Sequence, residues 1–186
     1  MVKQSKTPSA LPAALIVTPG ASADRDHPTL VAIEAGLPEI VVVRLTLATT
    51  SVPGAVKKIV TAAHELSTRR EIPLDQIAYG GRSFGGRSCS VAVAEGLPAS
   101  SLVLLSYPLH PPGKPDKLRV DHFPEIEVPA LFVSGEKDPF GTSNEFKRHV
   151  AAIPGKVQLE WVPGNHSPKG QDSAIVALMR TFFGLD

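Results

Sequence analysis

The 186-residue chain has a single cysteine, Cys89, and few aromatic residues. One cysteine excludes an intrachain disulfide and a zinc site built from several thiolates, and it fits a reducing compartment such as the cytoplasm. The sequence also lacks a run of the about eighteen apolar residues that a membrane-spanning helix needs. We therefore expect a cytoplasmic protein with no membrane partner.

The sequence also lacks an excess of either charge. It contains 19 Lys and Arg residues and 18 Asp and Glu residues, which gives a net charge of +1. The basic residues are scattered, and they cluster only in pairs such as Lys57-Lys58 and Arg69-Arg70. Binding to a polyanion needs a clustered basic patch, so no nucleic-acid partner is expected. The histidines and carboxylates show no metal-ligand spacing, and we predict no metal site and no cofactor.

The N-terminal segment only loosely imitates a secretory signal. Two lysines precede the apolar stretch Leu11–Val17, and small residues follow it, but the stretch is short and Pro12 interrupts it. Cleavage there would also delete an expected core strand. We therefore interpret residues 1–9 as a flexible N-terminus and residues 10–186 as a single domain.

Short apolar segments rich in β-branched residues alternate with helical patterns along this domain. The expected strands are 13–18, 40–45, 77–79, 101–106, 131–134 and 157–162. The expected helices are about 26–35, 51–67 and 84–95, one opened by a capping box at Thr142 and Glu145, and one containing 175–182. This alternation predicts an α/β fold with about six mostly parallel strands and helices on both faces. Segment 40–45 is apolar at nearly every position, which predicts a strand buried on both faces.

A G-x-S-x-G motif, Gly81–Gly85, lies between an expected strand and an expected helix. This context is typical of a nucleophile elbow, in which a serine occupies a tight strand-to-helix turn and small neighbours allow close packing. A plain glycine-rich turn is the alternative. The elbow interpretation makes Ser83 the candidate nucleophile, and the backbone N–H of Phe84 a candidate donor to the oxyanion.

A serine nucleophile needs a base and an acid further along the chain, in the order serine, acid, histidine. Asp138 and His166 each follow the carboxyl end of an expected strand, where ligands bind in open parallel sheets. Glu136 is the nearest competitor for the acid, and an ordinary Asp-Pro turn is the other interpretation of Asp138. His149 lies on an expected helix, so it is the weaker candidate for the base.

Other residues complete the expected site. A second oxyanion donor should come from the loop after the first strand, and Pro19 has no N–H, so Gly20 or Ala21 must supply it. Three further residues are candidates for the pocket, each with loop packing or surface pairing as the alternative: Arg82, Tyr107 and His110. Cys89 lies on the expected helix after the elbow and is expected to be a buried thiol rather than a second nucleophile.

Four blocks of sequence resemble one branch of the α/β-hydrolase superfamily. They are GGRSFGGR (80–87), LSYPLHPPGKPDKLR (105–119), LFVSGEKDPFG (131–141) and GNHS (164–167). The branch is the small, lidless, dienelactone-hydrolase-like one that includes testis-expressed and NSL-complex-subunit hydrolase-like proteins. The resemblance implies an α/β-hydrolase fold without a cap domain and without the first two strands of a larger hydrolase, and it maps Ser83, Asp138 and His166 onto the triad.

These observations predict a serine hydrolase that cleaves a small-molecule acyl substrate of the carboxylester type. Thioesters and amides stay open as substrates, and so does the oligomeric state. Because a fold does not fix a function, and because some members of the resembled branch act in complexes, a binding or scaffolding protein with an idle triad is the alternative.

Overall fold

The computed structural model describes residues 10–186, which form one six-stranded parallel sheet in the order β2-β1-β3-β4-β5-β6. The strands are β1 (Ala14–Thr18), β2 (Val41–Arg44), β3 (Ile77–Arg82), β4 (Ser101–Leu105), β5 (Ala130–Gly135) and β6 (Val157–Val162). The predicted α/β class and the six strands are confirmed. The flexible terminus predicted for residues 1–9 lies outside the described residues.

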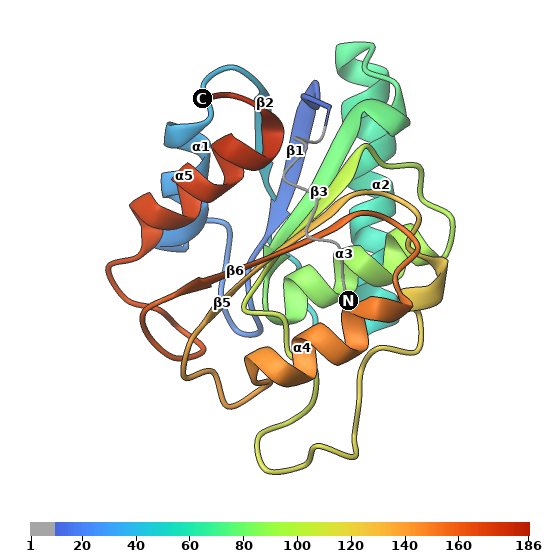
Figure 1. Cartoon of the computed structure of the whole chain (residues 1–186). Coiled ribbons are helices and arrows are strands. Elements are labelled where there is room, and N and C mark those ends of the chain that lie inside the picture. The colour runs from blue at the N-terminus through green and yellow to red at the C-terminus, as the bar shows by residue number, and fades with distance from the viewer. Residues whose placement is uncertain (1–9) are drawn as a thin grey trace.

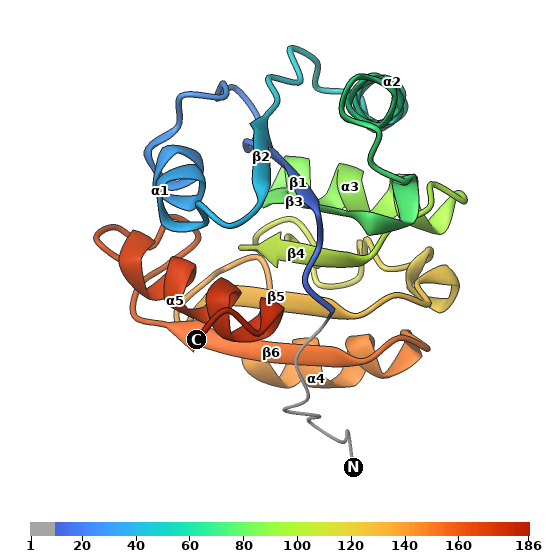
Figure 2. The ribbon, with the colours of Figure 1, turned by 90° about the horizontal axis from the view of Figure 1, so that it is seen from above.

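Helices cover both faces of the sheet. They are α1 (Pro28–Gly36), α2 (Val52–Arg70), α3 (Phe84–Ala94), α4 (Ser143–His149) and α5 (Asp172–Phe183). Helices α1 and α5 lie on one face, whereas α2, α3 and α4 lie on the other (Figures 1 and 2). Each face buries its own apolar cluster, so the sheet lies between two cores, as parallel sheets generally do. No domain is inserted among residues 10–186, and none of their helices is long and apolar enough to cross a membrane.

Side chains along β3 alternate between these two cores. Tyr79 packs with the α2, α3 and α4 cluster, whereas Ala78 packs with the α1 and α5 cluster. Because successive strand side chains point to opposite faces, the last residue of β3, Arg82, is directed to the α1 and α5 face. This direction separates Arg82 from the serine that follows it.

Two predictions about strands need correction. The segment 40–45 was expected to be buried on both faces, but all four residues of β2 are only partly buried because β2 is an edge strand. Strand β3 also runs to Arg82, three residues beyond the predicted 77–79. The sequence did not predict this extension because it contains Gly80 and Gly81, and glycine weakens the pattern that indicates a strand.

Helix starts follow local capping chemistry. The predicted capping box of α4 is present, with Thr142 Oγ1 accepting from Glu145 N and the Glu145 carboxylate accepting from Thr142 N. At α1, the ring of His27 accepts from Thr29 N and Pro28 occupies the first turn. These caps fix where the chain enters each helix, and therefore where the loops at the carboxyl edge of the sheet lie.

Candidate active site

Ser83 forms a sharp turn between β3 and α3. Its backbone has φ 48° and ψ −115°, a sparsely populated conformation that costs roughly 1–3 kcal/mol for a residue with a side chain. The turn is anchored at its start, since Ser83 N donates to Leu105 O on β4 at 2.8 Å. A methyl group at Gly81 would collide with Thr18, and one at Gly85 would collide with Pro19 O. The two motif glycines are therefore required for close packing of the elbow against β1.

The three residues predicted as a triad lie within hydrogen-bonding distance in series. His166 Nε2 is 2.8 Å from Ser83 Oγ, and His166 Nδ1 is 2.9 and 3.0 Å from the two oxygens of Asp138. A carboxylate can only accept, so Nδ1 carries the proton and Nε2 is free to accept from the serine hydroxyl. This is the protonation pattern in which an imidazole can act as a base toward Ser83.

Asp138 is held in a fixed orientation at the end of β5. Its side chain has no accessible surface, and Oδ1 also accepts from Phe140 N at 2.9 Å. The competitor Glu136 lies in the same turn, but it is exposed. A buried carboxylate is costly unless it is paired, and the imidazole supplies the partner here.

His166 lies on the loop after β6, and this loop is attached to the turn that carries the acid. Lys137 N donates to Gly164 O at 2.9 Å, and Gly135 lies so close to Asn165 O that a methyl group there would collide with it. The two loops therefore pack directly on each other. Sequence order predicted their proximity, but not the glycine contact that allows it.

The oxyanion candidates lie on both sides of Ser83. Phe84 is the first residue of α3, where the first N–H groups have no partner within the helix and the helix dipole is positive. Across the elbow, a methyl group at Gly20 would lie 3.7 Å from Ser83 Cβ, whereas Ala21 is exposed. Gly20 therefore lies directly beside Ser83.

Phe140 is a site residue that sequence reasoning missed. Its ring stacks on the imidazole of His166, with centroids 3.9 Å apart. The only sequence signal was its position two residues after Asp138.

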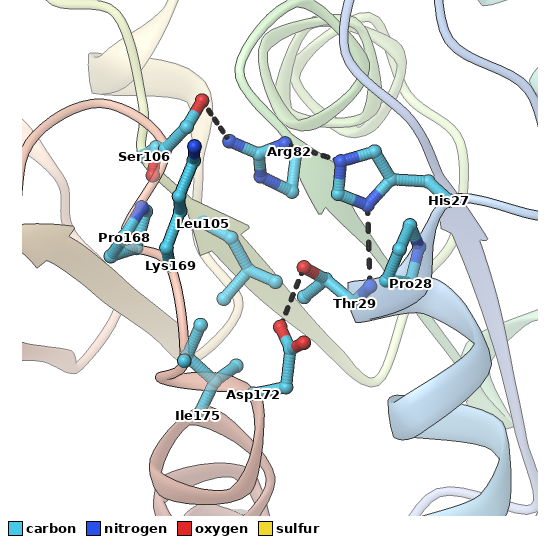
Figure 3. A pocket seen from close by; sticks show the side chains of 12 residues that line it. His27, Pro28, Thr29, Arg82, Leu105, Ser106, Pro168, Lys169, Asp172 and Ile175 are labelled. Carbon is cyan, nitrogen blue, oxygen red and sulfur yellow. Dashed lines mark hydrogen bonds between the residues drawn. The ribbon is translucent and has the colours of Figure 1, made fainter.

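Arg82 is almost buried, with 9% of its surface exposed. Nη1 lies 2.8 Å from His27 Nε2, and Nη2 donates to His166 O at 2.9 Å and to Ser167 Oγ at 3.1 Å. Its side chain contributes to the wall of a cavity that Ser83 does not line (Figure 3). It also holds the loop that carries the catalytic-base candidate, a contact that the sequence did not indicate.

The other pocket candidates lie in the packed interior. Tyr107 has no exposed surface, belongs to the core against α2, α3 and α4, and donates its hydroxyl to Arg119 O at 2.7 Å. His110 is 5% exposed and its Nδ1 is 2.8 Å from Pro111 O. The loop after β4 folds back over the core, so both side chains pack inward instead of facing a ligand.

Cys89 is fully buried, as predicted, and burial raises the pKa of its thiol to about 12. A protonated, inaccessible thiol is a poor nucleophile. Within residues 10–186, no group of three His, Cys, Asp or Glu side chains could hold a metal ion.

Comparisons with known proteins agree with this architecture. The sequence profile of an alpha/beta hydrolase domain matches residues 12–175. Dienelactone hydrolase from Anabaena variabilis has a similar structure (TM-score 0.77, 18% identity, 95% of this chain and 88% of that chain). Est1E from Butyrivibrio proteoclasticus is also similar (TM-score 0.75, 18% identity, 94% and 88%), as is an alpha-beta serine hydrolase homologue from Coxiella burnetii (TM-score 0.72, 15% identity, 96% and 88%).

At 15–18% identity, the solved structures establish similarity of the fold alone. The profile match spans most of the sequence and therefore establishes the family. The chain therefore belongs to the α/β-hydrolase domain family.

Proposed function

We propose that this protein is a serine hydrolase that cleaves a small carboxylic ester through an acyl-enzyme. The observation that carries the proposal is the continuous series of hydrogen bonds from the Asp138 carboxylate through the His166 ring to the Ser83 hydroxyl. A positioned base is what a serine hydroxyl needs to become nucleophilic.

In the proposed reaction, His166 Nε2 takes the proton of Ser83 Oγ as that oxygen attacks the acyl carbonyl. Asp138 keeps the proton on Nδ1 and stabilises the imidazolium that forms. The oxyanion is bound by the N–H of Phe84 and by an N–H of Gly20 or Ala21. The imidazolium then gives its proton to the leaving alkoxide, and a water activated by the same ring releases the acyl group from Ser83.

The choice of an ester rests on the names of similar structures and on access to the site. Neighbours of similar fold include a carboxylesterase from Mesorhizobium loti and a thermophilic esterase from Thermogutta terrifontis. Ser83 is only partly buried, and no cap domain is inserted in residues 10–186. An open site suits small acyl groups, and a panel of esters, thioesters and amides would rank the leaving groups.

The test is labelling by a fluorophosphonate probe together with hydrolysis of a p-nitrophenyl ester. We expect Ser83→Ala to abolish labelling and to lower kcat by about 10⁴-fold or more. Ser67→Ala, on the distant helix α2, is the matched control and should behave as wild type. If well-folded wild-type protein neither labels nor hydrolyses any ester, the enzyme proposal fails and a hydrolase-fold binding or scaffolding protein replaces it.

A further inference from the structure

Behind the elbow, on the face of the sheet covered by α1 and α5, lies a cavity of about 340 Å³ that the proposed reaction does not use (Figure 3). Its walls come from the start of α1, the end of β4, the loop after His166 and the first turns of α5. Arg82 belongs to this wall and Ser83 does not, because the two side chains point in different directions from the end of β3. The cavity is therefore separate from the expected acyl site.

The cavity wall contains a buried cation without a direct counter-ion. All three partners of the Arg82 side chain are neutral: a ring nitrogen of His27, a backbone carbonyl and the Ser167 hydroxyl. Among residues 10–186, no carboxylate lies within ion-pair distance of it. A guanidinium has five N–H groups, so two remain without a partner in this part of the chain. Burying a charge under these conditions is costly unless a counter-charge binds.

The hydrogen bonds of His27 leave a further N–H group beside the cavity without an acceptor. Its Nδ1 accepts from Thr29 N at 3.2 Å, while its Nε2 faces Arg82 Nη1 at 2.8 Å. Burial and the nearby Arg82 charge lower the pKa of His27, which keeps the ring neutral. A neutral imidazole accepts at one nitrogen only. The ring can accept either from Thr29 N at the start of α1 or from Arg82 Nη1, but not from both. One of these two N–H groups therefore has no acceptor on His27 and is free to donate to a ligand.

The remaining charges of the wall favour an anion. Lys169 is exposed at the rim, and in Figure 3 its amino group points toward the Arg82 guanidinium. The one carboxylate in the wall, Asp172, is already engaged, since its Oδ1 accepts from Thr29 Oγ1 at 2.7 Å. With His27 neutral, two positive groups face one negative group, for a net charge of +1.

We propose that this cavity binds a small organic carboxylate. Its oxygens accept from the free N–H groups of Arg82 and from Lys169, and its hydrocarbon part contacts Leu105 and Ile175, which give the wall an apolar side. The volume is at the lower end of that of small-molecule sites, which fits a short-chain acid. Arg82 also donates to the backbone carbonyl of His166. A ligand bound to Arg82 would therefore lie next to the loop that carries the proposed base, without entering the acyl site.

Binding of butyrate to the purified full chain tests this, measured by calorimetry and by thermal shift at constant pH and ionic strength. Butyramide is the neutral probe of the same shape. We expect butyrate to bind wild type and Ser83→Ala with equal affinity and butyramide to bind neither. Arg82→Met should weaken butyrate by about tenfold or more, as expected for hydrogen bonds to a charged group, and Arg82→Lys should recover part of the loss.

Arg82→Met can also disturb folding, so Lys169→Met is the second variant, because Lys169 is exposed. It should fold as wild type and weaken butyrate by about threefold, the usual size for a solvent-exposed charge pair. Lys58→Met, which removes the same charge from the distant α2, should bind as wild type. Equal binding of butyrate and butyramide, no binding of butyrate, or an affinity unchanged in both Arg82→Met and Lys169→Met would overturn the proposal. Loss of binding in Ser83→Ala would do the same, because it would place the ligand in the acyl site.

Discussion

The ring of Phe140 stacks against the imidazole of His166, with centroids 3.9 Å apart and the planes inclined by 28°. The same turn of the chain carries Asp138, whose Oδ1 accepts from Phe140 N at 2.9 Å. One short turn after β5 thus supplies the partner for Nδ1 and a flat surface that sets the plane of the ring. The imidazole of His166 is therefore held at its edge by the hydrogen bond to Asp138 and on its face by the ring of Phe140.

Removal of the stacked ring should therefore slow the reaction without unfolding the protein. Phe140→Leu keeps an apolar side chain but loses the aromatic face, which both orients the imidazole and favours its cationic form. We expect kcat on a small ester to fall by about three- to tenfold, with KM little changed. Phe140→Tyr keeps the ring and should retain wild-type kcat. An unaltered kcat in Phe140→Leu would mean that the hydrogen bonds alone orient His166.

Asp138→Asn tests the assignment of the acid. An amide in place of the carboxylate can donate to Nδ1, which favours the wrong tautomer and leaves Nε2 protonated toward Ser83. We expect kcat to fall by about 10⁴-fold, with the melting temperature showing a folded protein. Glu136→Gln, the exposed neighbouring carboxylate, should keep full activity. The opposite ranking of these two variants would move the acid role to Glu136.

Much of the fold could be predicted from the sequence because its signals are local. Apolar β-branched runs predicted six strands, and the pair Thr142 and Glu145 predicted the start of α4, as the structure confirms. Burial of β2 could not be predicted in this way. Its composition is that of a central strand, but its place at the sheet edge depends on strand order, which is a property of the whole chain.

The site shows the same division. Chain order and strand ends were enough to nominate Ser83, Asp138 and His166, because parallel strands bring their carboxyl ends to one edge. The loop after β4 follows no such rule, so the sequence left Tyr107 with a pocket and loop packing as alternatives, and the structure places it in the core. The contacts of Arg82 with the His166 loop join residues more than 80 positions apart, and no local pattern reveals them.

His122 should make stability depend on pH. Its Nε2 lies 2.8 Å from Ser90 Oγ, and burial, followed by the nearby Arg87, lowers its pKa from 6.5 to about 4. The unfolded chain then binds more protons than the folded one between these values, so stability is complete above about pH 6.5 and is lost as the pH falls toward 4. The full shift corresponds to about 3 kcal/mol, and because the ring is partly solvated the expected contribution to stability is about 2 kcal/mol.

The measurement is urea denaturation of wild type and His122→Gln at about pH 7 and about pH 4.5, since glutamine retains a donor for Ser90 but does not titrate. Acidification should destabilise wild type more than the variant, by about 1–2 kcal/mol. His27 and His149, whose pKa values are also lowered, contribute equally to both proteins and cancel. Parallel losses in the two proteins would show that His122 is not held neutral by the fold.

The strained backbone of Ser83 predicts that activity and stability oppose each other at the elbow. With φ 48° and ψ −115°, a residue with a Cβ is strained by roughly 1–3 kcal/mol, and glycine is not. Ser83→Gly and Ser83→Ala both lose the hydroxyl, so the difference between them isolates the backbone. Glycine also gains entropy in the unfolded chain, which offsets part of the relief. We expect Ser83→Gly to be the more stable by about 1 kcal/mol, or about 2–4 °C in melting temperature, with both variants inactive. If Ser83→Ala melts at the same temperature or higher, the turn is not strained, and the conformation of Ser83 is one that the surrounding sequence favours by itself.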